Sequence, residues 1–116
     1  MALELIRRGD IFLTQFESAR AGEANYIHPA IVATNNSTNL VSSVLVVIPI
    51  TSNIERIYPF ELALPNHRTG LNKDSKAQIN LIRHVNTDRF TRRLGFIPDD
   101  LMLELDRRIK EHLALT

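Results

Sequence analysis

Short apolar runs separated by polar turns make up most of the chain ahead of Pro98. The two clearest runs cover residues 30–33 and 44–50, and both are rich in β-branched residues. Runs of this kind, with polar residues at one end, are typical of buried strands that emerge at a surface. We therefore expect strands over residues 28–33 and 43–50. The second should be central in a sheet, with a bulge or bend at Pro49 near its end.

Other segments show the alternation of apolar and polar residues that is typical of a half-buried strand. Two such strands are expected over residues 58–64 and 77–85. A first strand is expected to begin near Asp10, and both of its faces carry bulk, with Phe12 and Phe16 on one and Ile11 and Leu13 on the other. Shorter elements are also expected: one helical turn within residues 34–39, the start of a short helix at Thr87-Asp88 and a last strand over residues 93–97.

The segment from Pro98 onward has the features of an amphipathic helix, which we expect over residues 98–115. Pro98 suits the first turn, and Asp99 and Asp100 favour the positive end of the helix dipole. Apolar residues recur with the helical period at Met102, Leu105, Ile109 and Leu113. Five or six short strands with one C-terminal helix predict a small α+β, mostly β, barrel. The length suits a single domain over residues 1–116.

Composition narrows the possible functions. The chain of 116 residues is 44% hydrophobic and 23% charged, and its formal net charge of +1 is far from the strongly basic balance of a non-specific nucleic-acid binder. Recognition of a polyanion must therefore depend on the local placement of basic residues. The adjacent pairs Arg7-Arg8, Arg92-Arg93 and Arg107-Arg108, each taken alone, are interpreted as solvated surface.

The chain has no cysteine, and its four histidines lack the spacing of a metal site. We therefore expect no disulfide, no metal ion and no cofactor. No apolar run approaches the about 20 residues that span a membrane, and the first residues do not resemble a signal peptide. A cytoplasmic protein is expected.

Three residues at the ends of the two clearest strands carry candidate chemistry. His28 precedes Pro29, which holds it in an extended conformation, and histidine side chains change charge between about pH 5 and 8, where proton transfer is useful. Thr51 and Ser52 offer hydroxyl and backbone N–H groups to an oxyanion or a phosphate. From spacing alone, His28 is more often a surface or capping residue than a catalyst. The sequence has neither a Ser-His-Asp spacing nor a phosphate-binding glycine loop, so it makes no case for acyl transfer or nucleotide hydrolysis.

Residues 17–26 are small, polar and without period, so we expect a loop between the first two strands. Binding residues are often found on loops, and this makes Arg20, Glu23 and Asn25 candidates for contacts to a ligand or partner. An ordinary surface loop is an equally good interpretation.

Four segments resemble the MazF/PemK/Kid family in order and spacing. They are RRGDIFLTQF, HPAIVATNN, VLVVIPITSN and KDSKAQINLIRHVNTDRF, and the resemblance extends from Arg8 to Leu115. This family comprises ribonuclease toxins of bacterial toxin–antitoxin pairs. The resemblance implies a small SH3-like (PemK/CcdB-like) barrel with a C-terminal helix, a homodimer and sequence-specific cleavage of single-stranded RNA. It also implies that cleavage needs no metal and that the ribose 2′-OH attacks the adjacent phosphate, leaving a 2′,3′-cyclic phosphate and a 5′-OH.

The match within the site is partial. The family usually has a catalytic Arg before the proline that begins the second strand, where this chain has His28. Thr51 and Ser52 match the Thr-Ser pair, and Arg83 matches the Arg of the family's Ile-Arg dipeptide. We therefore expect His28, Thr51 and Ser52 to be catalytic. The expected RNA contacts are Arg20, Asn25, Arg56, Gln78, Asn80 and Arg83.

Two alternatives to an active nuclease with His28 as base or acid stay open at this stage. One is a CcdB-like gyrase poison, which resembles the same fold and acts by binding a protein without chemistry. The other is a catalytically inactive barrel that binds RNA or a peptide. A toxin of this family also implies an antitoxin with an acidic, disordered tail that covers the RNA groove. Candidate contacts for that partner are Arg20, Arg56, Lys73 and Arg83.

Overall fold

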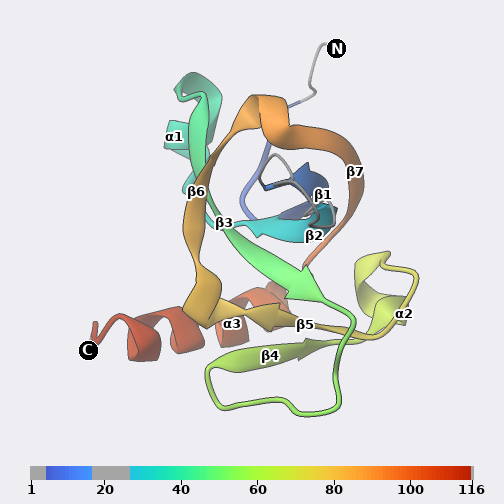
Figure 1. Ribbon diagram of the computed structural model, residues 1–116. Helices are drawn as coiled ribbons and strands as arrows, with labels where there is room; N and C mark the ends of the chain where they lie inside the picture. The colour runs from blue at the N-terminus through green and yellow to red at the C-terminus, as the bar shows by residue number, and fades with distance from the viewer. Residues whose placement is uncertain (1–4, 17–26, 116) are drawn as a thin grey trace, which may run out of the picture.

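The computed structural model describes residues 5–16 and 27–115, and Figure 1 shows their arrangement. The strands are β1 (Asp10–Gln15), β2 (Ile27–Val32), β3 (Val44–Thr51), β4 (Glu61–Leu64), β5 (Ser75–Gln78), β6 (Arg83–Asn86) and β7 (Phe90–Phe96). The helices are α1 (Asn36–Val41), α2 (Asn66–Thr69) and α3 (Asp99–His112), with 3-10 turns η1 (Ile79–Leu81) and η2 (Thr87–Arg89). The expected α+β, mostly β, class with a C-terminal helix is confirmed.

Strand β3 is central in the sheet, as its apolar sequence predicted. One of its edges pairs with β2, and the other pairs first with β6 and then with β5, all antiparallel. The change of partner falls between Val47, opposite Arg83, and Ile50, opposite Ala77. Pro49, which has no N–H to donate, lies within this gap. The irregularity predicted near Pro49 therefore takes the form of a change of partner strand.

The sheet curls round on itself. Its strands run in the order β4-β5-β3-β2-β1-β7, and β6 pairs with β3 off this row. The chain passes from β6 to β7 through η2 alone, yet β6 pairs with β3 and β7 pairs with β1. This short connection draws the two ends of the β3-β2-β1 row together, and Figure 1 shows β6 and β7 arching over it. The result is a small barrel.

Two apolar clusters fill the two faces of this curved sheet. Consecutive residues alternate between them, so Ile11 and Ile31 belong to one cluster while Phe12 and Val32 belong to the other. All four side chains are buried, which confirms that both faces of the first strand carry bulk. Helix α3 adds the fully buried Leu105 to the first cluster, and burial of one such side chain contributes about 2 kcal/mol.

Helix α3 packs its apolar side against the first cluster, with Leu101, Met102 and Ile109 partly buried around Leu105. Leu113 was expected on this side as well, but it lies at the C-cap and is 49% exposed. The period therefore holds through Ile109 and fails where the helix ends. Within the described part of the chain, no helix has both the length and the apolar character to span a membrane.

The strand expected over residues 58–64 is shorter than its alternation predicts, because β4 begins only at Glu61. The Glu61 carboxylate turns inward, accepts a hydrogen bond from the Tyr58 N–H at 2.9 Å and pairs with Lys76 at 3.0 Å. This local bond holds residues 58–61 in a turn, so the strand does not extend back to Tyr58. Tyr58 and Phe60 are consequently exposed, and their rings stack with centroids 5.2 Å apart.

The single strand expected over residues 77–85 is wrong, because η1 divides it into β5 and β6. These two strands pair with different parts of β3, so the chain must step between them. The Ile82 N–H closes the step by donating to the Ile79 carbonyl at 3.1 Å. Alternation across Gln78 and Asn80 is thereby lost, because Gln78 ends β5 and Asn80 lies in η1.

Helix α2 and strand β7 approach backbone to backbone at Gly70 and Gly95. A Cβ atom on Gly95 would lie 1.9 Å from the Thr69 carbonyl oxygen, and one on Gly70 would lie 2.9 Å from the Leu94 carbonyl oxygen. Gly70 also ends α2 with a φ of 86°, which favours glycine. This contact seats the loop after α2, residues 71–74, beside β7.

Candidate active site

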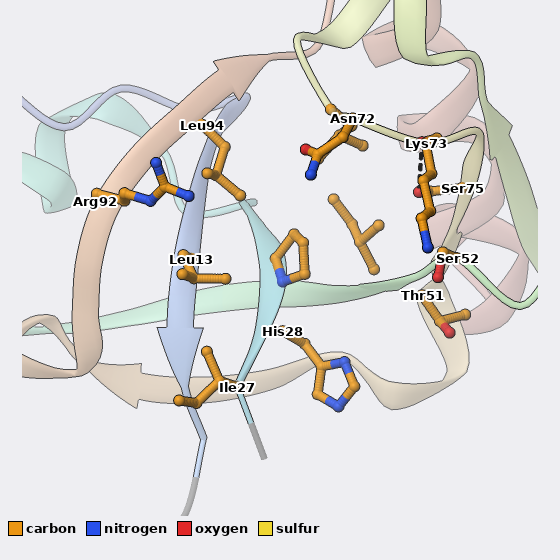
Figure 2. A pocket seen from close by; sticks show the side chains of 13 residues that line it. Leu13, Ile27, His28, Thr51, Ser52, Asn72, Lys73, Ser75, Arg92 and Leu94 are labelled. Carbon is orange, nitrogen blue, oxygen red and sulfur yellow. Dashed lines mark hydrogen bonds between the residues drawn. The ribbon is translucent and has the colours of Figure 1, made fainter. Parts of the chain in front are cut away.

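A pocket of about 320 Å³ opens between the start of β2, the end of β3, the loop after α2 and strand β7. Figure 2 shows His28 of β2, Thr51 and Ser52 at the end of β3, and Arg92 of β7 around this space. The pocket is lined by Leu13, Ile27, His28, Pro29, Ile50, Thr51, Ser52, Leu71, Asn72, Lys73, Ser75, Arg92 and Leu94. The three residues predicted to be catalytic therefore share one pocket.

The pairing of β2 with β3 explains why His28 and Thr51 come together. Their register is antiparallel, and its last pair is Ala30 with Pro49. Continuing this register by two residues brings His28 opposite Thr51, because each step along one strand is matched by a step back along the other. The start of one strand and the end of the other thus meet at the same edge of the sheet.

The hydroxyls of this edge are available to a ligand. Thr51 Oγ1 accepts a hydrogen bond from the Asn53 N–H at 3.2 Å, which leaves its own O–H free to donate. Ser52 is exposed where the chain leaves β3, and His28 is exposed at the start of β2. An imidazole and two hydroxyl groups therefore line the pocket without a structural role in the core.

Lys73 and Arg92 also line the pocket, and neither was predicted as a catalytic or RNA-binding residue. Lys73 was expected only as a partner contact, and Arg92 only as solvated surface. Arg92 belongs to the pocket because β7 pairs with β1, where Arg92 lies opposite Leu13. The sequence signal for this role was weak: Arg92 and Leu94 alternate in the last strand, but no local pattern shows which strand lies beside it.

The described lining of the pocket is positively charged. Among these described residues there is no Asp or Glu. The charged groups of Lys73 and Arg92 form no ion pair with any residue of the described segments. Other basic side chains do form ion pairs: Arg8 with Asp106, Arg68 with Asp100, Lys76 with Glu61, Arg93 with Asp10, and Arg107 and Arg108 with Glu104. A site of this charge attracts anions.

The interpretation of the basic pairs as solvated surface is therefore wrong in detail. Within the Arg92-Arg93 pair, Arg93 bonds Asp10 and lies 4.8 Å from the centroid of the Phe12 ring, while Arg92 faces the pocket. Strand alternation separates the two side chains, because neighbouring residues point to opposite faces. One residue of the pair stabilises the fold and the other remains free to bind.

Four of the predicted RNA contacts lie outside the pocket lining. Arg56 donates to the Tyr58 hydroxyl at 3.3 Å, and the Arg83 guanidinium lies 5.1 Å from the centroid of the Phe16 ring. Gln78 ends β5 and Asn80 lies in η1. Contact of these residues with RNA stays a prediction.

Two further candidates, Arg20 and Asn25, lie outside the described residues. Within the described ones, no three His, Asp or Glu side chains are grouped to hold a metal ion. The candidate chemistry of the pocket is therefore that of His28, hydroxyls and two cations.

The fold and the pocket define a class of protein: a small curved β-sheet with a C-terminal helix and an anion-attracting site where the central strand ends. A family model described as PemK-like, MazF-like toxin of type II toxin–antitoxin system matches residues 7–113. The chain belongs to this family, which confirms the resemblance found in its sequence. It is 38% identical to the endoribonuclease MazF9 of Mycobacterium tuberculosis (strain ATCC 25618 / H37Rv), over 96% of this chain and 98% of that protein.

Solved structures of MazF proteins have the same fold. The chain matches MazF in the MazE–MazF structure from Deinococcus radiodurans with a TM-score of 0.82 and 23% identity, over 97% of this chain and 99% of that one. It also matches an endoribonuclease in complex with its cognate antitoxin from a mycobacterial species, with a TM-score of 0.78, 16% identity and 98% coverage of both chains. At these identities the likeness establishes the fold.

Proposed function

We propose that the chain is a sequence-specific endoribonuclease that cleaves single-stranded RNA without a metal ion, by attack of a ribose 2′-OH on the adjacent phosphate. Membership of the MazF-like toxins and the 38% identity to an endoribonuclease support the activity class. One observation carries the chemistry: a single pocket gathers His28, Thr51 and Ser52 with two cations, and its described lining offers these cations no carboxylate partner.

In this mechanism His28 is the general base. The 2′-OH proton passes to its imidazole while the 2′ oxygen bonds to phosphorus. The bond from phosphorus to the 5′ oxygen breaks, and that oxygen takes a proton from water. The products are a 2′,3′-cyclic phosphate and a 5′-OH, and loss of the proton from His28 restores the enzyme.

Thr51 and Ser52 hold the phosphate during the reaction. Their hydroxyl groups, and the backbone N–H of the chain as it leaves β3, donate to the phosphate oxygens whose charge rises in the transition state. The other predicted contacts would touch nucleotides that flank the scissile bond. In the described residues these contacts are Arg56, Gln78, Asn80 and Arg83.

The proposal is tested by primer extension on a long RNA incubated with the protein and a chelator. We expect discrete breaks with 5′-OH ends in wild type and none with His28→Ala, and His84→Ala is a matched control because His84 is exposed on β6 outside the pocket. Wild-type cleavage by His28→Ala would remove this residue from the mechanism. RNA left intact by wild type would instead favour a gyrase-binding toxin or an inactive barrel.

A pH profile tests the role of His28 separately. A base must be unprotonated to accept the 2′-OH proton, so the cleavage rate should fall as the pH is lowered from about 8 to about 5. A flat profile across this range in wild type would contradict the assignment.

The proposal includes protein partners. A cognate antitoxin with an acidic tail would neutralise the toxin by covering the cationic pocket. Two related solved structures are described as complexes, one with a cognate antitoxin and one of MazE with MazF. A homodimer is also proposed, to be measured by light scattering with and without antitoxin. Because the attraction is local, antitoxin affinity should fall as salt is raised.

A further inference from the structure

We infer that Arg92 is a further catalytic residue, which holds the scissile phosphate and supplies the fixed positive charge that His28 cannot. The inference deepens the proposed function and rests on it. If His28 is the base, it must be neutral before the 2′-OH reacts, so the imidazole offers no fixed charge to the bound phosphate. A fixed charge must come from another residue of the pocket.

Only Lys73 and Arg92 among the described lining residues carry a permanent positive charge. Lys73 comes from the loop after α2, whereas Arg92 comes from β7, which is paired along its length with β1. Figure 2 shows Arg92 on one wall of the pocket and Lys73 with Ser52 on the other. A guanidinium also presents two parallel N–H donors to a phosphate, which an ammonium does not.

The register of the sheet places Arg92 in the same row as the head of β2. Arg92 lies opposite Leu13 of β1, and Leu13 lies opposite Pro29 of β2. Residues directly opposite in antiparallel strands project from the same face, and all three line the pocket. His28 is next to Pro29, two strands or about 10 Å from Arg92. Neighbouring strand residues point to opposite faces, but His28 is exposed at the start of β2 and also lines the pocket. A phosphate between the two side chains would be within reach of both, because an arginine side chain is long and flexible.

The pairing of β7 with β1 is irregular on both sides of this row. The register shifts between Ile11 and Phe12 and again between Leu13 and Thr14. Bulges of this kind re-aim side chains and occur often beside active sites. Between the two shifts, Arg93 turns to Asp10 while Arg92 turns to the pocket. Because Arg92 has no ion pair in the described structure, removing its charge should leave the fold intact.

The test compares Arg92→Gln, Arg92→Lys and Lys73→Gln with a matched control, Arg107→Gln. The control changes the net charge equally, and Arg107 lies on α3 outside the pocket with its side chain 61% exposed. We expect Arg92→Gln to lower the cleavage rate by about 10²–10³-fold, as for loss of one oxyanion donor. Arg92→Lys should recover part of that loss, and Arg107→Gln should stay close to wild type.

Binding is measured in parallel with an RNA that carries a 2′-deoxy sugar at the cleaved position and cannot react. Arg92→Gln should reduce the slope of log affinity against log salt by about 0.7, the value for one phosphate contact to a single strand. Arg107→Gln should leave the slope unchanged.

The outcomes separate the two proposals. If wild type cleaves RNA and Arg92→Gln cleaves equally well, the role of Arg92 is refuted while the proposed function stands. If cleavage is lost in Lys73→Gln but not in Arg92→Gln, the role of Arg92 is also refuted, and Lys73 supplies the charge instead. If wild type leaves RNA intact, the proposed function fails, and an unchanged salt slope in Arg92→Gln would then refute the phosphate contact as well.

Discussion

Replacing Gly95 by Ala adds one methyl group at the point where β7 meets the end of α2. The new Cβ atom would lie 1.9 Å from the Thr69 carbonyl oxygen and 3.2 Å from the Gly70 Cα. Non-bonded heavy atoms in favourable contact lie about 3.5 Å apart. The two backbone segments must therefore separate by about 1.5 Å, and neither is a flexible side chain that can turn away.

The end of α2 has little freedom to move. The Gly70 N–H donates to the Asn66 carbonyl at 3.2 Å, and the Thr69 hydroxyl donates to the Pro65 carbonyl at 3.1 Å. We therefore expect Gly95→Ala to cost about 3 kcal/mol or more, the upper end for an added group in a packed interior. For a domain of this length that corresponds to a fall in Tm of roughly 10–15 °C.

The assays are urea unfolding and, below the Tm, binding of the non-cleavable RNA. A shift of the 71–74 loop away from β7 widens the pocket between Lys73 and Arg92, so binding should weaken even in the folded variant. Gly9→Ala is the matched control. Gly9 has a φ of 95°, but its Cβ would only touch the flexible Met102 side chain at 3.4 Å, so it loses about 1–2 kcal/mol from backbone strain alone.

Backbone conformation alone predicts the opposite order of stability, with Gly9→Ala the more destabilised variant, because Gly9 is in the left-handed region and Gly95 is not. A Gly95→Ala variant as stable as wild type, or more stable than Gly9→Ala, would refute the close approach of α2 and β7.

Two further predictions concern ion pairs. Lys76→Met should destabilise the fold by about 3–5 kcal/mol in urea unfolding, because it leaves the buried Glu61 carboxylate unpaired. The double variant Lys76→Met/Glu61→Leu should recover much of this loss. A double variant no more stable than the single one would contradict the explanation. The hydrogen bond from Arg68 holds the pKa of Asp100 below its ordinary value of 3.8. This exposed pair therefore adds a small stability above that pH, which is lost as the pH falls through the lower value in the folded state. Asp100→Asn should be slightly less stable than wild type at neutral pH and equally stable in strong acid. The urea midpoints of both proteins at the two pH values measure this. A difference in stability that persists in acid would show that the ion pair is not the cause of the difference.

Much of the fold and part of the candidate site could be predicted from sequence because their signals are local. The apolar run of β3 predicted a central strand, and polar residues at the two strand ends predicted that His28 and Thr51 would meet. The structure brings these residues into one pocket, while their catalytic roles stay predictions. Local patterns sufficed here because β2 and β3 are successive strands that are joined through α1 and pair directly with each other.

The features that sequence reasoning missed depend on contacts between distant segments. Alternation over residues 77–85 could not show that β3 changes partner, so the step at η1 was missed. The inward turn of Glu61 depends on Lys76 of a later strand. Arg92 was assigned to the surface because its place in the pocket follows from pairing with β1, which no local pattern reveals.

The pairing of β1 with β7 also has a consequence for synthesis on the ribosome. Asp10 meets Phe96 and Leu13 meets Arg92, so the nascent chain cannot close the barrel until β7 has left the exit tunnel. At about 5–20 residues per second, the interval between synthesis of Thr51 and of Phe96 is several seconds. During that interval the growing polypeptide carries His28, Thr51 and Ser52 without the wall that holds Arg92. On the proposed mechanism, the nascent chain therefore cannot cleave the mRNA that encodes it until this last strand has docked.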